Sequence, residues 1–303
     1  MEFAQALIDS VKESPYSPAV VSTIKSNRAN RNGKLLFDVM AHEVAGIDTT
    51  SVYPPTDAAQ ASKLISLLAS HDNAQPLHKV CLTYYVFLDY PEDLTQGDHL
   101  GSYFADETDM PRGFRELVEG LWCIDRQQYD QGLKHLCHPE VRPTFVDEII
   151  SALPDGKHVL AYITCSSPKL LNDKTVSRCV NALCSVSLFQ ALEFARSASC
   201  DVQEDLLTEI TKFCFANDPR RNIWRLANLP LTKTEDKLLV ERILPSIISS
   251  STEETERSLA KDILLVRSLH TGNKEAAALV SELKASTSAG GISWTNLAQG
   301  LTH

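Results

Sequence analysis

Hydrophobic residues recur along most of the chain at the spacing that places them on one face of an α-helix. The most informative stripe consists of Phe114, Leu117, Val118, Leu121 and Trp122. A short polar turn and a second stripe, from Tyr129 to Leu136, follow it. The pattern predicts a helical hairpin in which Trp122 is buried against the helix that carries Tyr129 and Leu133. The small residue Gly132 stands where the two helices can approach closely.

The same spacing predicts further helices on both sides of this hairpin. They are expected at residues 35–44, 61–68, 145–153, 175–196, 203–215, 234–248 and 253–270. Residues 79–89 are rich in β-branched and aromatic types that also suit a buried strand, but their neighbours are helical and we predict a helix. The separations between the hairpins differ, so there is no fixed repeat period. The sequence therefore predicts an all-α fold, an irregular stack of helical hairpins of the α-solenoid type without a significant sheet.

Two segments depart from this pattern. Residues 89–110 contain seven acidic side chains, no Lys or Arg, and three helix-breaking residues, which predicts a solvated loop. Residues 286–303 are polar and rich in Gly and Ser, which predicts a C-terminal tail. We expect a single helical domain over residues 1–285, with a candidate seam in the acidic loop.

Charge and hydropathy exclude several classes of protein. The 303 residues include 29 Lys or Arg and 39 Asp or Glu, for a formal net charge of −10. DNA, RNA and anionic membranes favour basic surfaces, so this balance argues against wholesale capture by any of them. The longest apolar run, near residues 80–88, is about half as long as a membrane span. The sequence also starts without the charged and apolar regions of a signal peptide.

The cysteines point to a reducing environment. All eight are scattered along the chain, and none forms a C-x-x-C pair. A long chain without a signal peptide or a glycosylation sequon is typical of a nucleocytoplasmic protein. We therefore expect the cysteines to be reduced and to act as small residues of the core.

Motifs for catalysis and metal binding are missing from the sequence. It contains no G-x-S-x-G, G-x-G-x-x-G, G-x-x-x-x-G-K or H-E-x-x-H. His135, Cys137 and His138 form the strongest metal-like cluster, but a structural zinc needs four ligands and no second pair has a similar spacing. Imidazoles at a helix end also suit the terminal carbonyl groups. We expect no enzyme activity, no metal and no cofactor.

Residues 218–225 and the tail supply the candidate partner-binding residues, which are Arg220, Arg221, Trp224 and Trp294. The first three lie in a predicted connection between helices. Arg and Trp together can anchor a protein partner or grip phosphate and stack on a base, and the indole can equally pack into the core. Trp294 has no local core in its Gly/Ser-rich surroundings. Its indole needs a pocket either on this protein or on a partner.

A basic stretch near the N-terminus offers an alternative function. Positive side chains recur every three residues at Lys25, Arg28, Arg31 and Lys34. This spacing indicates either a basic face for phosphate or an acidic partner, or a solvated helix face. Together with the arginines of residues 220–225, it supports the alternative of a helical protein that binds chromatin or nucleic acid.

Four blocks of sequence follow one another in the chain: HKVCLTYYVFLD at 78–89, MPRGFRELVEGLWCID at 110–125, LPLTKTEDKLL at 229–239, and residues 264–279 with their Thr-Gly-Asn turn. Taken in this order, they resemble the α-helical domain of the ELYS nuclear pore proteins. The second block continues into Tyr129-x-x-Gly-Leu-x-x-Leu and His138-Pro-Glu. Together the blocks cover roughly residues 35–285.

The resemblance implies a non-catalytic scaffold or adaptor of the nuclear pore complex at the nuclear envelope, with a part in mRNA and protein transport. It implies nucleoporins of the Y-shaped outer-ring complex as partners, near the β-propeller-bearing long arm, without membrane insertion or direct DNA binding. Animal members carry an N-terminal β-propeller and a basic tail with AT-hooks. This sequence begins at the helical domain and contains no Arg-Gly-Arg-Pro, so it resembles a short, fungal-type member.

Overall fold

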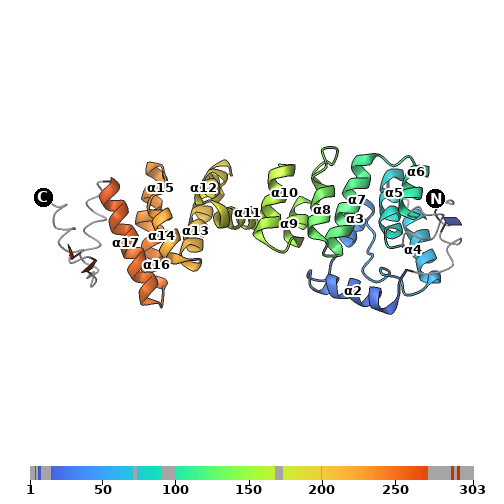
Figure 1. Cartoon of the computed structure of the whole chain (residues 1–303), viewed down its shortest axis with the longest axis horizontal. Helices are drawn as coiled ribbons and strands as arrows, with labels where there is room; N and C mark the ends of the chain where they lie inside the picture. The colour runs from blue at the N-terminus through green and yellow to red at the C-terminus, as the bar shows by residue number, and fades with distance from the viewer. Residues whose placement is uncertain are drawn as a thin grey trace. The chain divides into compact units, whose positions relative to one another are not determined.

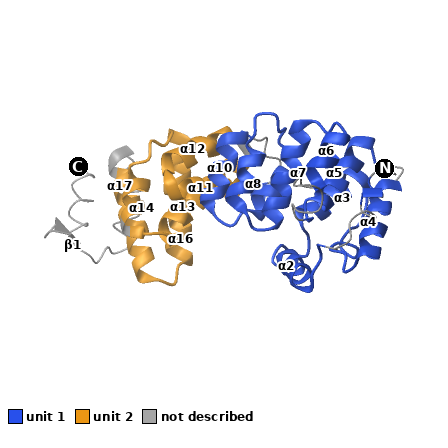
Figure 2. Cartoon of the chain, turned by 45° about the vertical axis from the view of Figure 1, so that its right-hand side comes forward, with its two compact units in different colours: residues 1–175 blue, residues 176–303 orange. Residues whose placement is uncertain are grey.

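The computed structural model describes residues 4, 6–7, 15–70, 74–90, 100–167, 173–198, 200–271, 288–289 and 292–293 (Figure 1). Most of these residues are helical, and the strands among them, β1 (Ser288–Ala289) and β2 (Ile292–Ser293), form one antiparallel pair. The predicted all-α fold is confirmed. The chain divides into two compact units, residues 1–175 and 176–303 (Figure 2), whereas the sequence predicted one domain over residues 1–285 with a candidate seam at 89–110.

The helices of unit 1 follow one another along the chain. They are α2 (Pro18–Ala29), α3 (Leu36–Ala45), α4 (Ala58–Ser70), α5 (Pro76–Phe87), α6 (Leu100–Glu107), α7 (Arg112–Asp125), α8 (Tyr129–Leu136), α9 (Val146–Ala152) and α10 (Gly156–Ser166). Local sequence explains several of their ends. The Ser17 side chain accepts a hydrogen bond from the Val20 amide at the start of α2. Gly46 ends α3 in the left-handed conformation, with φ of 69°.

Helix α5 is the central element of unit 1. The helix predicted at residues 79–89 is confirmed, and every residue from 81 to 87 is buried. A helix that is buried on all its sides belongs to the core rather than to the surface. It contacts α3, α4, α6 and α7, which explains why its composition resembles that of a buried strand.

Helix α6 corrects the prediction for the acidic segment. The sequence predicted a loop throughout residues 89–110, but residues 100–107 form a helix, while 91–99 lie outside the described residues. Leu100, Phe104 and Ala105 are buried, and α6 packs on α5. Their spacing of four and five residues places them on one helical face, so the burial of this face outweighs the local excess of acidic residues.

The predicted hairpin of α7 and α8 is confirmed, and two glycines let its helices approach closely. A Cβ atom at Gly120 would lie 2.6 Å from Leu136 Cγ, and one at Gly132 would lie 2.8 Å from Ile124 Cδ1. Real Cβ atoms essentially never come within 3.0 Å of another heavy atom. The hairpin interface therefore has no room for a larger residue at either position.

Trp122 does not pack against α8, as the sequence predicted. Its side chain is half-buried, and the indole Nε1 donates a hydrogen bond to Asp89 Oδ1 at 2.7 Å. Gly120 and Ile124 of α7 lie in direct contact with α8. Residues two positions apart lie about 200° apart around a helix, so Trp122 points away from this interface and towards the end of α5.

Replacing Gly120 with alanine is expected to destabilise unit 1. In an open helix this change adds about 1 kcal/mol of stability. Here the new methyl group would overlap Leu136, and overpacking of this kind costs about 1–3 kcal/mol. Urea denaturation measures the net loss. Gly101→Ala is the control with a milder contact, because its nearest atom, Tyr84 Cε2, lies at 3.2 Å; a gain in stability from Gly120→Ala would contradict the tight packing.

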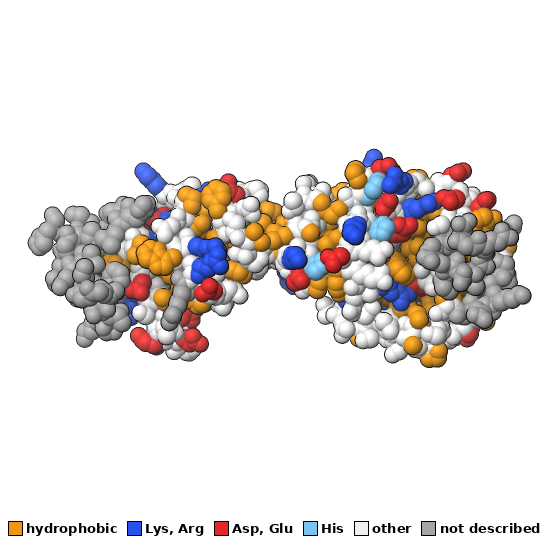
Figure 3. Space-filling view, in the orientation of Figure 1, with side chains coloured by type: hydrophobic (Ala, Val, Ile, Leu, Met, Phe, Trp, Pro, Cys, Tyr) orange, Lys and Arg blue, Asp and Glu red, His pale blue; other side chains and the backbone are white. Residues whose placement is uncertain are grey.

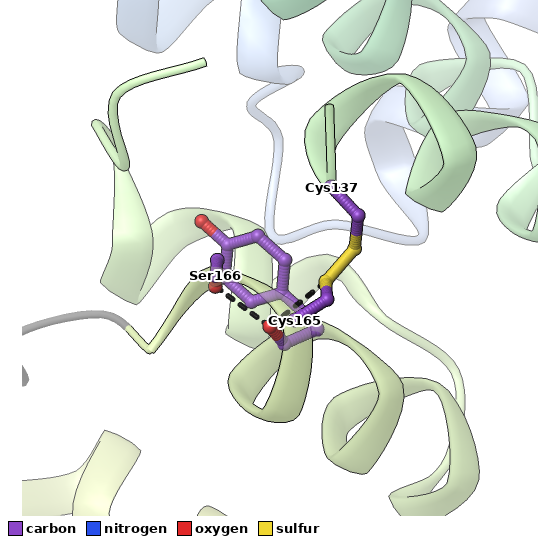
Figure 4. The surroundings of a disulfide bond; sticks show 4 residues. Cys137, Cys165 and Ser166 are labelled. Atoms are coloured by element: carbon purple, nitrogen blue, oxygen red, sulfur yellow. Dashed lines mark hydrogen bonds between the residues drawn. A yellow bond between two sulfur atoms is a disulfide. The ribbon is translucent and has the colours of Figure 1, made fainter. Parts of the chain in front are cut away.

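The cysteine prediction is correct for part of the set and wrong for one pair. Cys137, at the end of α8, forms a disulfide with Cys165 of α10 (Figure 4). The two Cα atoms lie 5.6 Å apart, a separation that suits a disulfide. The packing of α10 on α8 brings together residues that are 28 positions apart. The free cysteines described by the structure, which are Cys81, Cys123, Cys179, Cys184 and Cys214, are all buried.

Asp125, at the end of α7, forms the centre of a buried polar network in unit 1. It is 2% exposed, and its carboxylate accepts hydrogen bonds from the Leu36 amide (2.9 Å), the Phe37 amide (3.0 Å) and the Tyr85 hydroxyl (2.8 Å). Arg31 also donates to it. The first amides of a helix lack partners within the helix, so Asp125 caps α3 from a distant part of the chain.

Unit 2 is a second helical stack with its own core. Its helices are α11 (Asp173–Val186), which begins just before the division, α12 (Leu188–Ser197), α13 (Cys200–Ala216), α14 (Pro219–Ala227), α15 (Lys233–Leu238), the π-helical segment η2 (Leu239–Ile243), α16 (Leu244–Ser250) and α17 (Glu254–Thr271). The helix predicted at 175–196 is two helices, because the Ser187 side chain caps a new helix by accepting from the Gln190 amide. The buried side chains of α11 to α17 form one hydrophobic cluster.

A buried ion pair connects the helices of unit 2. Arg267 of α17 is 3% exposed and donates to Asp236 Oδ1 of α15 at 2.6 Å. The same guanidinium donates to the carbonyl groups of Ala227 (3.0 Å) and Leu229 (2.8 Å). Arg267 thereby satisfies the Ala227 carbonyl at the end of α14, which no later residue of that helix can reach, and binds the Leu229 carbonyl just beyond the helix.

Candidate interaction surface

The segment that carries three of the candidate partner-binding residues is a helix and not a connection. Pro219 is the first residue of α14, where its missing N–H costs nothing. Within α14 the buried side chains include Ile223 and Leu226, three residues apart, so these positions face the core of unit 2. The opposite side of the helix is left to Arg221, Trp224 and Arg225, which are exposed.

Trp224 is the most exposed of the large hydrophobic side chains that the structure describes, at 66%. The sequence left open whether this indole packs into the core, and its exposure shows that it does not. Arg221 and Arg225 flank it at i−3 and i+1, and neither forms an ion pair with another described residue. The visible face of unit 2 in Figure 3 shows hydrophobic side chains next to Lys and Arg side chains. The exposed side chains of Arg221, Trp224 and Arg225 are together named the α14 face.

A hollow of about 570 Å³ adjoins the start of α14. It is lined by Lys212, Phe215, Ala216, Pro219, Glu253, Thr255, Glu256 and Leu259. Apolar carbon from the ends of α13 and α14 meets acidic side chains from the start of α17 in this hollow. The hollow has room for a partner's side chain that carries both apolar and polar groups, next to the α14 face.

The sequence missed a second apolar surface, at the junction of α11 and α12. Val186 is 61% exposed and Phe189 is 51% exposed. Both were placed inside a single predicted helix at residues 175–196. Ser187 could have indicated this surface, because serine favours the N-cap of a new helix. A helix boundary at Ser187 leaves the residues next to it exposed.

Two of the predicted residues are not placed by the structure. Trp294 lies outside the described residues, and so does the side chain of Arg220, although its backbone belongs to α14. Their proposed roles stay predictions from the sequence.

The basic stretch from Lys25 to Lys34 is not the uniform solvated face that the sequence suggested. Arg28 donates two hydrogen bonds to Asp38, at 2.8 and 2.9 Å, and one to the Tyr53 carbonyl at 2.7 Å. Arg31 donates to Asp125, as described above. Only Lys25 and Lys34 of the four are exposed, so half of the proposed phosphate-binding charge already has buried partners within the protein.

The free cysteines are poor candidates for nucleophilic catalysis. Burial raises the pKa of the Cys81, Cys184 and Cys214 thiols to about 12. A thiol of this pKa holds almost no reactive thiolate at neutral pH.

Among the described residues, no helix combines the length and apolar character that crossing a membrane requires.

His135 has acidic partners that the sequence did not suggest. Its Nδ1 atom lies 2.8 Å from Glu116 Oε2 and 3.1 Å from Glu119 Oε2. Partial burial acts to raise the pKa of Glu116, but the hydrogen bond and charge of His135 outweigh it, and the pKa is lowered. Cys137 is held in the disulfide, and His138 Nδ1 accepts from the Glu140 amide at 3.3 Å. The three residues of the predicted cluster thus have separate partners.

Comparison with known proteins gives two matches. An uncharacterised protein of Schizosaccharomyces pombe, ely5, is 23% identical over 230 residues, which cover 74% of this chain and 74% of that protein. The family model of ELYS, described as nuclear pore complex assembly, matches residues 34–246, from the start of α3 into α16. This match extends over both units, and the chain therefore belongs to the ELYS family of nuclear pore complex assembly.

Proposed function

We propose that this protein is a non-catalytic scaffold of the nuclear pore complex, located at the nuclear envelope, which docks on nucleoporins of the Y-shaped outer-ring complex through the α14 face. Membership of the ELYS family supports a role in nuclear pore assembly. The observation that carries the choice of surface is Trp224, which is 66% exposed on an otherwise well-packed helix.

The chemistry of the α14 face suits a protein interface. Trp and Arg are enriched among residues that dominate binding energy, and they act best in a patch that the partner covers completely. A stable interface needs upward of about 1,000 Å² of buried surface, so the α14 face would act as the centre of a larger contact. Arg221 and Arg225, without ion-pair partners among the described residues, favour a partner surface with acidic side chains.

Replacing Trp224 with alanine is expected to remove docking without unfolding the protein. The side chain is largely exposed, so the change should alter stability by no more than about 0.5 kcal/mol. Loss of a central interface Trp costs about 2 kcal/mol or more of binding free energy, which corresponds to at least about a thirtyfold loss of affinity. The measurements are thermal melting of the purified variant, its localisation in cells, and the amount of outer-ring nucleoporins that co-purify with it.

Phe189→Ala is the matched control, because it removes an exposed aromatic side chain from another part of unit 2. It is expected to leave localisation and co-purification unchanged. If Trp224→Ala behaves like the wild type while Phe189→Ala loses its partners, the interface lies at the α11–α12 junction instead.

A truncation tests the other anchor expected from the sequence. Removal of residues 286–303, which include Trp294, is expected to leave a folded protein that is recruited poorly to the nuclear envelope. Unfolding of the truncated protein would show that the tail is a structural clasp. Normal recruitment would contradict a role of Trp294 in docking.

A further inference from the structure

Three side chains with metal-binding atoms converge between α7 and α8. Glu116 and Glu119 lie one turn apart on α7, and His135 lies on the facing helix α8. One carboxylate oxygen from each Glu and one imidazole nitrogen all lie within 4.8 Å of one another. Each side chain is only 17–24% exposed. The hairpin fold therefore brings together one nitrogen and two oxygen ligands in a partly dehydrated position.

The second oxygen of each carboxylate has its own partner. The Tyr84 hydroxyl of α5 donates to Glu119 Oε1, and Arg112 Nε lies 3.5 Å from Glu116 Oε1. These contacts orient the two Oε2 atoms towards His135. Hydrogen bonds from an outer shell of this kind are what hold metal ligands in place in known sites.

We propose that Glu116, Glu119 and His135 form a binding site for Zn²⁺. Zinc binds His nitrogen and carboxylate oxygen at about 2.0–2.2 Å in a tetrahedron, in which ligand atoms are about 3.4 Å apart. The observed separations from His135 Nδ1 are 2.8 and 3.1 Å, so the imidazole nitrogen and the two oxygens need to move apart by about 0.3–0.6 Å. The fourth position is left for water or for an external ligand.

The charges around the site are compatible with a dication. Two carboxylates neutralise Zn²⁺ completely. Arg115 lies nearby but is paired with Asp106, and the charge of Arg112 is largely screened by solvent because its side chain is 64% exposed. An imidazole together with carboxylates favours Zn²⁺ over Mg²⁺ and Ca²⁺, which prefer sites made of oxygen alone.

These ligands are not the same set as the metal-like cluster in the sequence, which consisted of His135, Cys137 and His138. Both Cys137 and His138 have other partners in the structure. The ligands that replace them come from the preceding helix, 19 and 16 residues before His135. A zinc ion in this position would connect the two helices of the hairpin whose tight contact Gly120 and Gly132 allow.

Calorimetric titration of the full, chelator-treated chain with Zn²⁺ alone, in a buffer without reductant, tests the proposal. One site is expected, and Glu116→Gln, Glu119→Gln and His135→Asn are each expected to weaken it at least about tenfold. His138→Asn and Glu140→Gln are matched controls at the end of the same hairpin and should bind as the wild type does. The absence of binding, or equal binding by His135→Asn, would overturn the proposal.

Two further measurements keep the result independent of folding defects. Tyr84→Phe preserves the buried ring and removes the hydroxyl that orients Glu119, so it is expected to weaken Zn²⁺ binding about tenfold. Zn²⁺ at about 100 times its Kd should raise the Tm of the wild type by about 5 °C or more. The Tm of a folded Glu116→Gln/Glu119→Gln variant should not move; an equal rise would overturn the proposal. Neither α7 nor α8 carries the α14 face, so failure here would leave the docking proposal intact.

Discussion

Replacing Asp125 with alanine is expected to lower the free energy of unfolding of unit 1 by about 3–5 kcal/mol, the cost of removing one member of a buried ion pair. The change leaves Arg31, whose side chain is 12% exposed, without its carboxylate. It also leaves the Leu36 and Phe37 amides and the Tyr85 hydroxyl without the acceptor that each uses in the native protein. An unsatisfied buried polar group adds its own desolvation cost.

Chemical denaturation, followed by circular dichroism, measures this loss, and hydrogen exchange localises it. Exchange should accelerate first at the start of α3. Asp130→Ala is the matched control, since its carboxylate is 96% exposed at the start of α8, and it should change stability by less than about 0.5 kcal/mol. Equal stability of the Asp125→Ala variant would mean that water or another group can replace the carboxylate.

Replacing Arg267 with methionine is expected to destabilise unit 2 by a comparable amount, about 3–5 kcal/mol. Methionine keeps most of the volume of the side chain, so the change isolates the loss of charge and hydrogen bonds. Asp236, 7% exposed, would stay buried without its cation. The carbonyl groups of Ala227 and Leu229 would lose their shared donor.

Arg242→Met is the control for this variant. Its side chain is 67% exposed and pairs with Glu204 at 2.7 Å, and exposed pairs contribute little to stability. Hydrogen exchange should show that Arg267→Met loosens α14, α15 and α17, and that Asp125→Ala leaves these helices unchanged. Loss of protection in both units from either variant would show that they unfold as one cooperative body.

The sequence predicted those features that depend on neighbouring residues. The stripe on α7 and the turn before Tyr129 were enough to predict the first hairpin, because hydrophobic spacing and turn chemistry act within a few residues. The start of α14 could also have been predicted from the sequence, since Asp218-Pro219 is typical of a helix start.

The features that the sequence did not predict depend on distant partners. Arg31 and Asp125 are 94 residues apart, and the regular spacing of the basic residues gave no sign that Arg31 is half-buried against a carboxylate. The sequence did not indicate Glu116 and Glu119 as metal ligands, because their nearness to His135 depends on how α7 and α8 pair. The disulfide depends in the same way on the packing of α10 against α8.

The cap that Asp125 supplies to α3 has a consequence for synthesis of the chain. Asp125 follows Leu36 by 89 residues, and a ribosome adding about 5–20 residues per second takes about 4–18 s to reach it. During this interval the nascent segment that forms α2 and α3 has neither the acceptor for its first amides nor the partner of Arg31. Unit 1 cannot complete its fold until the end of α7 has left the ribosome, so its N-terminal third depends on chaperones, or on its own solubility, for that time.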